Sequence, residues 1–222
     1  MSDFLGRHDE LSPASGFQAY LVQQKAPVLR PHYHEVDQFQ IVVAGTGKLG
    51  GHVAAAGTVH YSDAYTSYGP IMTTEPEGLS YFTLRLDPAI GINFMPESRA
   101  KRGTPGGEHF TCQVATGSGT GLGLLAETRR GAQAWTLHVP VGAPLERAAL
   151  APLHGRGYAI VLAGEIVLGG RLLPERTVIP FTEPSTLAGM RTEGGVATLA
   201  VVTFAQQAER PADRTDGHGL RA

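Results

Sequence analysis

The chain has 222 residues, of which 42% are hydrophobic and only 17% are charged. Its 18 basic and 20 acidic side chains give a formal net charge of -2, and no run of Lys or Arg accumulates, which argues against a nucleic-acid partner. The 29 glycines and 15 prolines favour many short strands joined by turns over long surface helices. We therefore expect an all-β protein.

Three features of the sequence bear on the cellular compartment. The single cysteine, Cys112, excludes an intramolecular disulfide. The polar start, MSDFLGRHDE, lacks the apolar core of a secretory signal, and no apolar run approaches the roughly 18 residues that suggest a membrane span. We expect a cytoplasmic protein with no membrane partner.

Segments rich in β-branched and aromatic residues, bounded by Gly, Pro, Asp and Ser, predict strands along most of the chain. In chain order these segments are 39–45, 57–62 and 79–86, then 135–141, 158–164, 176–181 and 197–204. Between the two groups, residues 87–131 are rich in Gly, Pro and charge, and 122–130 is their only stretch with a helical pattern. Strands at this spacing are typical of a β-sandwich or barrel.

The two groups of strands form an internal repeat. Gly45 ends the stretch IVVAG, and Gly164 ends IVLAG 119 positions later. At the same offset, the pair Thr58-Val59 matches Thr177-Val178 without a gap. The chain therefore contains two copies of one β domain.

The stretch RPHYHEVDQFQIVVAGTG, residues 30–47, carries the main candidate site. Successive side chains on a strand alternate between faces, so His32 and His34 project from the same side, about 6.6 Å apart along the strand. A tight turn at residues 35–37 would let the next strand offer Gln38 to the same point. Two imidazoles and an amide oxygen could then bind one metal ion.

This pattern resembles the first conserved motif of the cupin superfamily, in which two histidines, a glutamate and a glycine recur at nearly this spacing. The resemblance covers residues 16–86 well and 133–205 in strand pattern only. It implies an all-β fold of two tandem cupin-type jelly-roll barrels, a bicupin. The domain map is then an N-terminal barrel at 1–88 with the metal site, a partly irregular linker at 89–131, a degenerate C-terminal barrel at 132–206 and a flexible tail at 207–222.

The sequence departs from the cupin pattern in its ligands. Gln38 stands at the glutamate position and brings a dipole but no charge, which favours non-redox, Lewis-acid chemistry. Tyr68 stands where the second motif has its histidine, so the fourth ligand is Tyr68, His60 or a water molecule. In the second unit, the offset of 119 replaces His32 by Ala151 and His34 by Leu153, which leaves only the first unit able to bind a cation.

These features predict a metal-dependent enzyme that acts on a small organic molecule in the first barrel. One divalent ion, Zn, Ni, Mn or Fe, would be bound by His32, His34 and Gln38 with His60, while Tyr68, Tyr65 or His60 moves a proton during isomerisation, cyclisation or elimination. One alternative is a non-haem iron dioxygenase with the same ligands. The other is a non-catalytic bicupin that binds a metabolite. A homodimer is possible in each case.

Overall fold

The computed structural model describes residues 1–8, 16–117 and 119–205, which form strands joined by turns and loops. The helices in these ranges are three short 3-10 segments, η1 (Arg99–Lys101), η2 (Arg147–Leu150) and η3 (Pro184–Leu187). In the described part of the chain, no helix is long and apolar enough to cross a membrane. The predicted tail at 207–222 lies outside the described residues.

The first unit is built on one large antiparallel sheet. Its main path runs β1 (Ser2–Leu5), β2 (Gln18–Gln24), β9 (Leu79–Arg85), β5 (Gln38–Leu49), β7 (Thr58–Ser62) and β11 (His109–Gln113). Three short strands branch from the far half of β5: β6 (His52–Ala55), β8 (Ile71–Thr73) and β3 (Val28–Leu29), which pairs with β8. Opposite, β4 (His32–Tyr33) pairs with β10 (Asn93–Phe94). These pairings curl the unit without closing it into a complete barrel.

The second unit repeats this plan on a smaller scale. Its sheet runs β12 (Gly121–Glu127), β13 (Gln133–Val139), β18 (Ala197–Thr203), β14 (Gly157–Ala163) and β17 (Val178–Phe181), and a hairpin joins β15 (Ile166–Leu168) to β16 (Arg171–Leu173). This order corresponds strand for strand to β1-β2-β9-β5-β7 of the first unit. The register shift between Val42 and Ala44 also recurs 119 positions later, between Val161 and Ala163. The predicted internal repeat and all-β fold are confirmed.

The glycine that anchors the repeat is required by the backbone. Gly45 has φ +81°, a conformation that L side chains rarely adopt, and a Cβ at this position would lie 2.0 Å from the carbonyl oxygen of Gly78. Gly164 has φ +76° at the corresponding place in the second unit. Gly45 lies within β5 and Gly164 directly follows β14, and the positive φ favours glycine at this bend in both units.

The helix expected within the predicted linker at 89–131 is wrong, because strands form in this region. Residues 109–113 form β11, which pairs with β7 at the edge of the first sheet. The stretch expected to be helical, 122–130, forms most of β12, which pairs with β13 in the second sheet. The spacing of Leu122 and Leu125 fits a helix, but pairing with β13 lets both leucines pack against the apolar cores, and this tertiary contact overrides the local pattern.

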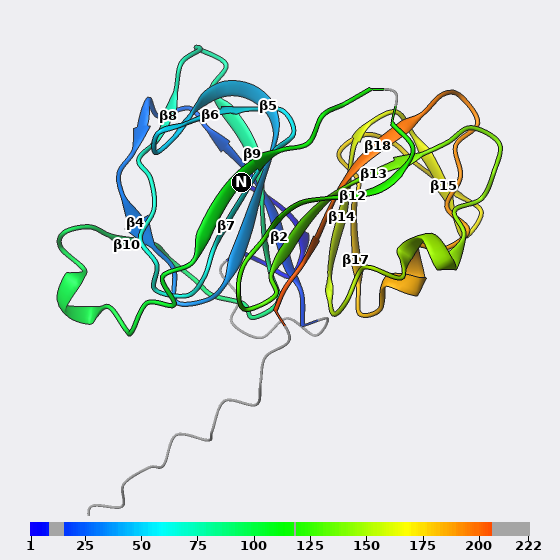
Figure 1. Ribbon diagram of the computed structural model, residues 1–222. Helices are drawn as coiled ribbons and strands as arrows, with labels where there is room; N and C mark the ends of the chain where they lie inside the picture. Colours follow the sequence, from blue (N-terminus) through cyan, green and yellow to red (C-terminus); the bar gives the residue numbers. More distant parts are fainter. Residues whose placement is uncertain (9–15, 118, 206–222) are drawn as a thin grey trace, which may run out of the picture.

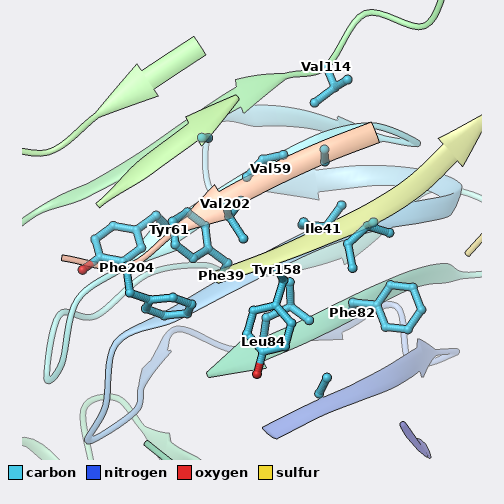
Figure 2. Packing of buried hydrophobic residues seen from close by; sticks show 14 of the residues in the cluster. Phe39, Ile41, Val59, Tyr61, Phe82, Leu84, Val114, Tyr158, Val202 and Phe204 are labelled. Carbon is cyan, nitrogen blue, oxygen red and sulfur yellow. The ribbon is translucent and has the colours of Figure 1, made fainter. Parts of the chain in front are cut away.

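The two units pack face to face through a shared apolar core (Figure 1). The first unit contributes side chains from β5, β7 and β9, and the second contributes side chains from β14 and β18. Phe39 meets Phe204 with ring centroids 5.0 Å apart, and Phe17 meets Tyr158 at 5.3 Å. Figure 2 shows Phe82 and Leu84 on the same side of this cluster as Tyr158.

The interiors of the two units differ in polarity. The second is filled by aliphatic and aromatic side chains, among them Leu137, Val161, Phe181, Leu199 and Val201. In the first unit, polar side chains point inward from strands β2, β5, β7 and β9. The buried ones include Gln18, Gln38, Gln40, His60, Thr83 and Arg85. Among the described residues, the interior of the first unit therefore offers more polar groups to a ligand than that of the second.

Because the shared core joins both units, we predict that they unfold together. Phe82 is fully buried in this core, and Phe82→Ala should lower the free energy of unfolding by about 3–5 kcal/mol in a single cooperative transition. Urea denaturation followed by circular dichroism and tryptophan fluorescence measures this, since Trp135 reports on the second unit. The exposed Val53→Ala is the control, with an expected change within about 0.5 kcal/mol. Two separate transitions would contradict the prediction.

Candidate ligand-binding site

The motif segment, residues 32–38, turns where the sequence predicts, but it is not a β-hairpin, because β4 pairs with β10 and not with β5. The chain leaves β4 after Tyr33, bends at Glu35 and Val36, and enters β5 at Gln38. The backbones of His32 and Tyr68 are paired through two hydrogen bonds of 3.1 and 3.0 Å. The His32 and His34 rings lie with their centroids 5.3 Å apart. The structure therefore brings together His32, His34, Gln38 and Tyr68.

A fifth residue, Arg85 at the end of β9, lies at the centre of this cluster and is almost fully buried. Its Nη2 donates to His34 Nδ1 at 3.1 Å and to Gln38 Oε1 at 2.9 Å, and its Nε donates to the same oxygen at 3.2 Å. Its Nη1 donates to Gln18 Oε1 at 3.0 Å and to the carbonyl oxygen of Ala89 at 2.6 Å. All five N–H groups of the guanidinium are thus used, and every acceptor is neutral.

The guanidinium fixes the direction of each hydrogen bond around it, because it can only donate. The amide atom of Gln38 that faces Arg85 must be oxygen, so Gln38 Nε2 donates to the hydroxyl of Tyr68. His32 Nδ1 lies 2.8 Å from the carbonyl oxygen of Arg30 and must carry the proton there. His32 Nε2 therefore accepts from the Tyr68 hydroxyl, 2.9 Å away. One continuous chain of donors runs from Arg85 through Gln38 and Tyr68 to His32.

Burial and the guanidinium charge keep both motif histidines neutral. Burial lowers the pKa of His32 to about 4, and the charge of Arg85 adds to this shift. The pKa of His34 lies well below its usual value, first because of burial and then because of Arg85. Burial also raises the pKa of Tyr68 well above its usual range. At neutral pH, Arg85 is the charged member of this cluster.

These contacts do not fit a divalent metal ion. A metal needs a free lone pair on each ligand, but the Tyr68 hydroxyl occupies that of His32 Nε2, and Arg85 occupies that of His34 Nδ1 and the oxygen of Gln38. An ion here would lie beside a buried guanidinium without a carboxylate to offset either charge. Among the described residues, no group of three or more His, Cys, Asp or Glu could hold a metal.

Of the two remaining predicted site residues, His60 lies beside the cluster and Tyr65 lies outside it. His60 is buried beside Tyr68, with ring centroids 4.8 Å apart, and its Nδ1 lies 2.9 Å from Thr111 Oγ1. Burial lowers the pKa of His60 to about 3. Tyr65 lies outside the cluster, since its ring packs against Tyr33 at 6.1 Å, on the opposite side of the motif strand. The structure does not bring Tyr65 to His32 or His34.

A cavity of about 480 Å³ opens in front of the two motif histidines. Strand β2 supplies Tyr20, Val22 and Gln24 to its wall, β9 supplies Tyr81 and Thr83, and β5 supplies Gln40. The segment HYSDAYTSY, residues 60–68, holds the predicted proton-transfer residues His60, Tyr65 and Tyr68, but none of its residues lines this cavity. The wall comes instead from β2, β5 and β9, whose alternating polar positions are the signal that could have revealed it.

No protein-family model matches the chain, and no curated protein matches its sequence. Solved structures match its fold. A proposed dioxygenase of Nostoc punctiforme aligns over 85% of this chain and 69% of its own, with a TM-score of 0.58 and 11% identity. Bacterial pirin YhhW of Escherichia coli, solved with nickel(II), aligns over 86% and 82%, with a TM-score of 0.51 and 11% identity.

A third match is Bacillus subtilis oxalate decarboxylase, a protein with Mn(II) centres, over 86% of this chain and 70% of its own, with a TM-score of 0.50 and 11% identity. These neighbours and the duplicated sheets of this chain show a cupin-type jelly-roll fold in two tandem units. At 11% identity the likeness establishes the fold alone.

The buried neutral state of His60 predicts how stability depends on pH. Between pH 6.5 and about 3, the unfolded chain protonates this histidine while the folded chain does not, so stability falls as the pH is lowered through this range. His60→Gln should reduce the slope of unfolding free energy against pH by about 1 kcal/mol per unit. Urea denaturation from pH 7 to 4 measures both slopes. Parallel curves for the two proteins would contradict the assignment.

Proposed function

We propose that the first cupin domain binds a small organic molecule in the cavity beside His32 and His34, and that the second domain is a scaffold. The observation that carries this proposal is the contrast between the two interiors. The first has a cavity of about 480 Å³ with polar side chains in its wall, whereas apolar side chains pack the second. Ligand cavities in proteins commonly fall within roughly 300–1,000 Å³.

The protonation states favour binding over catalysis. A general acid or base works best when its pKa lies near the operating pH. Burial moves the pKa of His32 to about 4 and that of His60 to about 3, and the His32–Tyr68 hydrogen bond is already made within the protein. We infer that these groups position a ligand and do not exchange protons with it.

A metal-dependent cupin enzyme, whether a Lewis-acid isomerase or lyase or an iron dioxygenase, is the second candidate. The nickel(II) of the pirin complex and the Mn(II) centres of oxalate decarboxylase support it, as do the two neutral imidazoles and the amide that converge in this chain. The contacts of Arg85 with His34 and Gln38 oppose it. We therefore place metal-free binding first.

Metal content separates the two candidates. We expect the purified protein to carry far less than one equivalent of Zn, Ni, Mn or Fe by inductively coupled plasma mass spectrometry. Adding each ion should leave the melting temperature unchanged, because both imidazole lone pairs are engaged. One equivalent of metal that is lost in the double variant His32→Ala, His34→Ala would overturn this expectation and favour the enzyme.

Blocking the cavity tests the binding proposal itself. After equilibrium dialysis against a deproteinised cell extract, the wild-type protein should retain about one equivalent of a small molecule, detected by mass spectrometry after denaturation. Val22→Trp fills part of the cavity and should abolish retention. Val53→Trp, on the exposed edge of β6, is the matched control and should retain the compound. If the wild-type protein retains nothing, the binding proposal fails.

A further inference from the structure

Two glutamines in the cavity wall have amide oxygens without a partner. Gln24 is 7% exposed, and its Nε2 donates to the carbonyl oxygens of Ala26 and Ile71, both at 3.1 Å. Gln40 is 4% exposed and lies on β5. Within the described parts of the chain, neither Gln24 Oε1 nor Gln40 Oε1 has a hydrogen-bond partner, although both atoms are buried. Both residues line the cavity.

An unpaired buried acceptor is costly, so each oxygen gains from a donor that a ligand in the cavity supplies when the amide turns toward it. A carboxylate or ether oxygen of a ligand cannot supply one, whereas a hydroxyl or an N–H can. The two glutamines lie on different strands of the wall, Gln24 at the end of β2 and Gln40 near the start of β5. A ligand that satisfies both therefore carries donors at two separate positions.

The charge around the cavity selects for an anion. The wall contains no Asp or Glu among the residues that the structure describes, and it includes Lys25. Asp3 is paired with His8 of the wall at 2.9 Å. Arg85 lies directly behind His34 and takes part in none of the ion pairs in residues 1–8, 16–117 and 119–205. Its positive charge has no carboxylate partner in these ion pairs, although the guanidinium lies over the ring of Tyr20, with Cζ 5.6 Å from the ring centroid.

We propose that the ligand of this cavity is a small carboxylate that carries hydroxyl groups. Its hydroxyls donate to Gln24 and Gln40, and its negative charge offsets the buried guanidinium through space. The carboxylate does not contact Arg85 itself, because all five of its N–H groups are already used within the protein. This inference rests on the proposed binding function and names its ligand class.

Matched probes separate the two parts of this recognition. The hydroxy acids glycerate, tartrate and gluconate are compared with the neutral polyols glycerol, threitol and sorbitol, and with the carboxylates propionate, succinate and hexanoate. We expect at least one hydroxy acid to bind ten-fold or more tightly than its polyol and its plain carboxylate, by isothermal titration calorimetry and by the rise in melting temperature. If the cavity holds only water, no probe should give heat of binding or a rise in melting temperature.

Substitutions at Gln40 then locate the contact. Gln40→Leu removes the acceptor and should weaken binding of the hydroxy acid ten-fold or more. Gln40→Glu retains an acceptor but adds a negative charge, so it should weaken the hydroxy acid to a similar extent while leaving the weak binding of the polyol unchanged. Leu172→Glu, at an exposed position of the second domain, adds the same negative charge and should alter neither. To check that each variant folds, its melting temperature without ligand is compared with that of the wild-type protein.

The outcomes distinguish this inference from the proposal on which it rests. If the polyols or plain carboxylates bind as tightly as the hydroxy acids, or if Gln40→Glu leaves hydroxy-acid binding intact, the ligand class is overturned while a binding site remains. The same holds if no probe binds but the dialysed wild-type protein retains a compound of another class. If neither a probe nor a compound from the extract binds, the binding function falls as well.

Discussion

The buried guanidinium of Arg85 is the constraint on which the rest of the site depends. A permanently charged group can be buried at moderate cost only if each of its donors is satisfied. Arg85 satisfies its five N–H groups with Gln18 of β2, Gln38 of β5, His34 of the motif segment and the carbonyl oxygen of Ala89. One side chain thereby ties together two sheet strands, the motif segment and the segment that follows β9. Loss of this cation would leave several buried acceptors without donors.

The second domain contributes to the same arrangement from outside. The Tyr158 hydroxyl, on β14, lies 2.6 Å from the carbonyl oxygen of Arg85 and 3.2 Å from that of Gln18. A hydroxyl has one proton, so it donates to the two oxygens in a shared manner. The contact fixes the ends of β9 and β2, the strands that carry the guanidinium and one of its acceptors. The second domain thus helps to hold the candidate site of the first.

The architecture was predictable from the sequence because it depends on features repeated along the chain. The paired glycines at 45 and 164 and the alternating apolar strands were enough to predict two similar β domains, and the spacing of His32, His34 and Gln38 was enough to predict that these side chains converge. The sequence was not enough to predict that residues 122–127 form a strand. That strand depends on pairing with β13, a contact that local sequence does not encode. The leucine spacing of this segment fits a helix, yet the segment forms an edge strand of the second sheet.

Arg85 was missed for a related reason. In the stretch LRL it reads as an ordinary exposed residue of a strand end, and its role becomes visible only when β9 is placed between β2 and β5. The signal that was available is the alternation of Gln18, Tyr20, Val22 and Gln24, and of Thr83 and Arg85, against apolar neighbours that face the shared core. Polar residues at every second position of strands flanked by apolar residues indicate a polar interior, and such an interior requires a ligand, water or a buried cation.

A polar interior also gives the first domain a physical reason to pack against the second. Glutamines, histidines and an arginine in place of aliphatic side chains reduce the apolar area that the first domain can bury within itself, and this burial is the main source of stability in a folded chain. The outer face of its sheet, with Phe39, Ile41, Phe82 and Leu84, is instead buried against the second domain. The duplicated fold thus separates two tasks that conflict in one small domain. One interior is free to be polar because the apolar contacts that stabilise it lie between the domains.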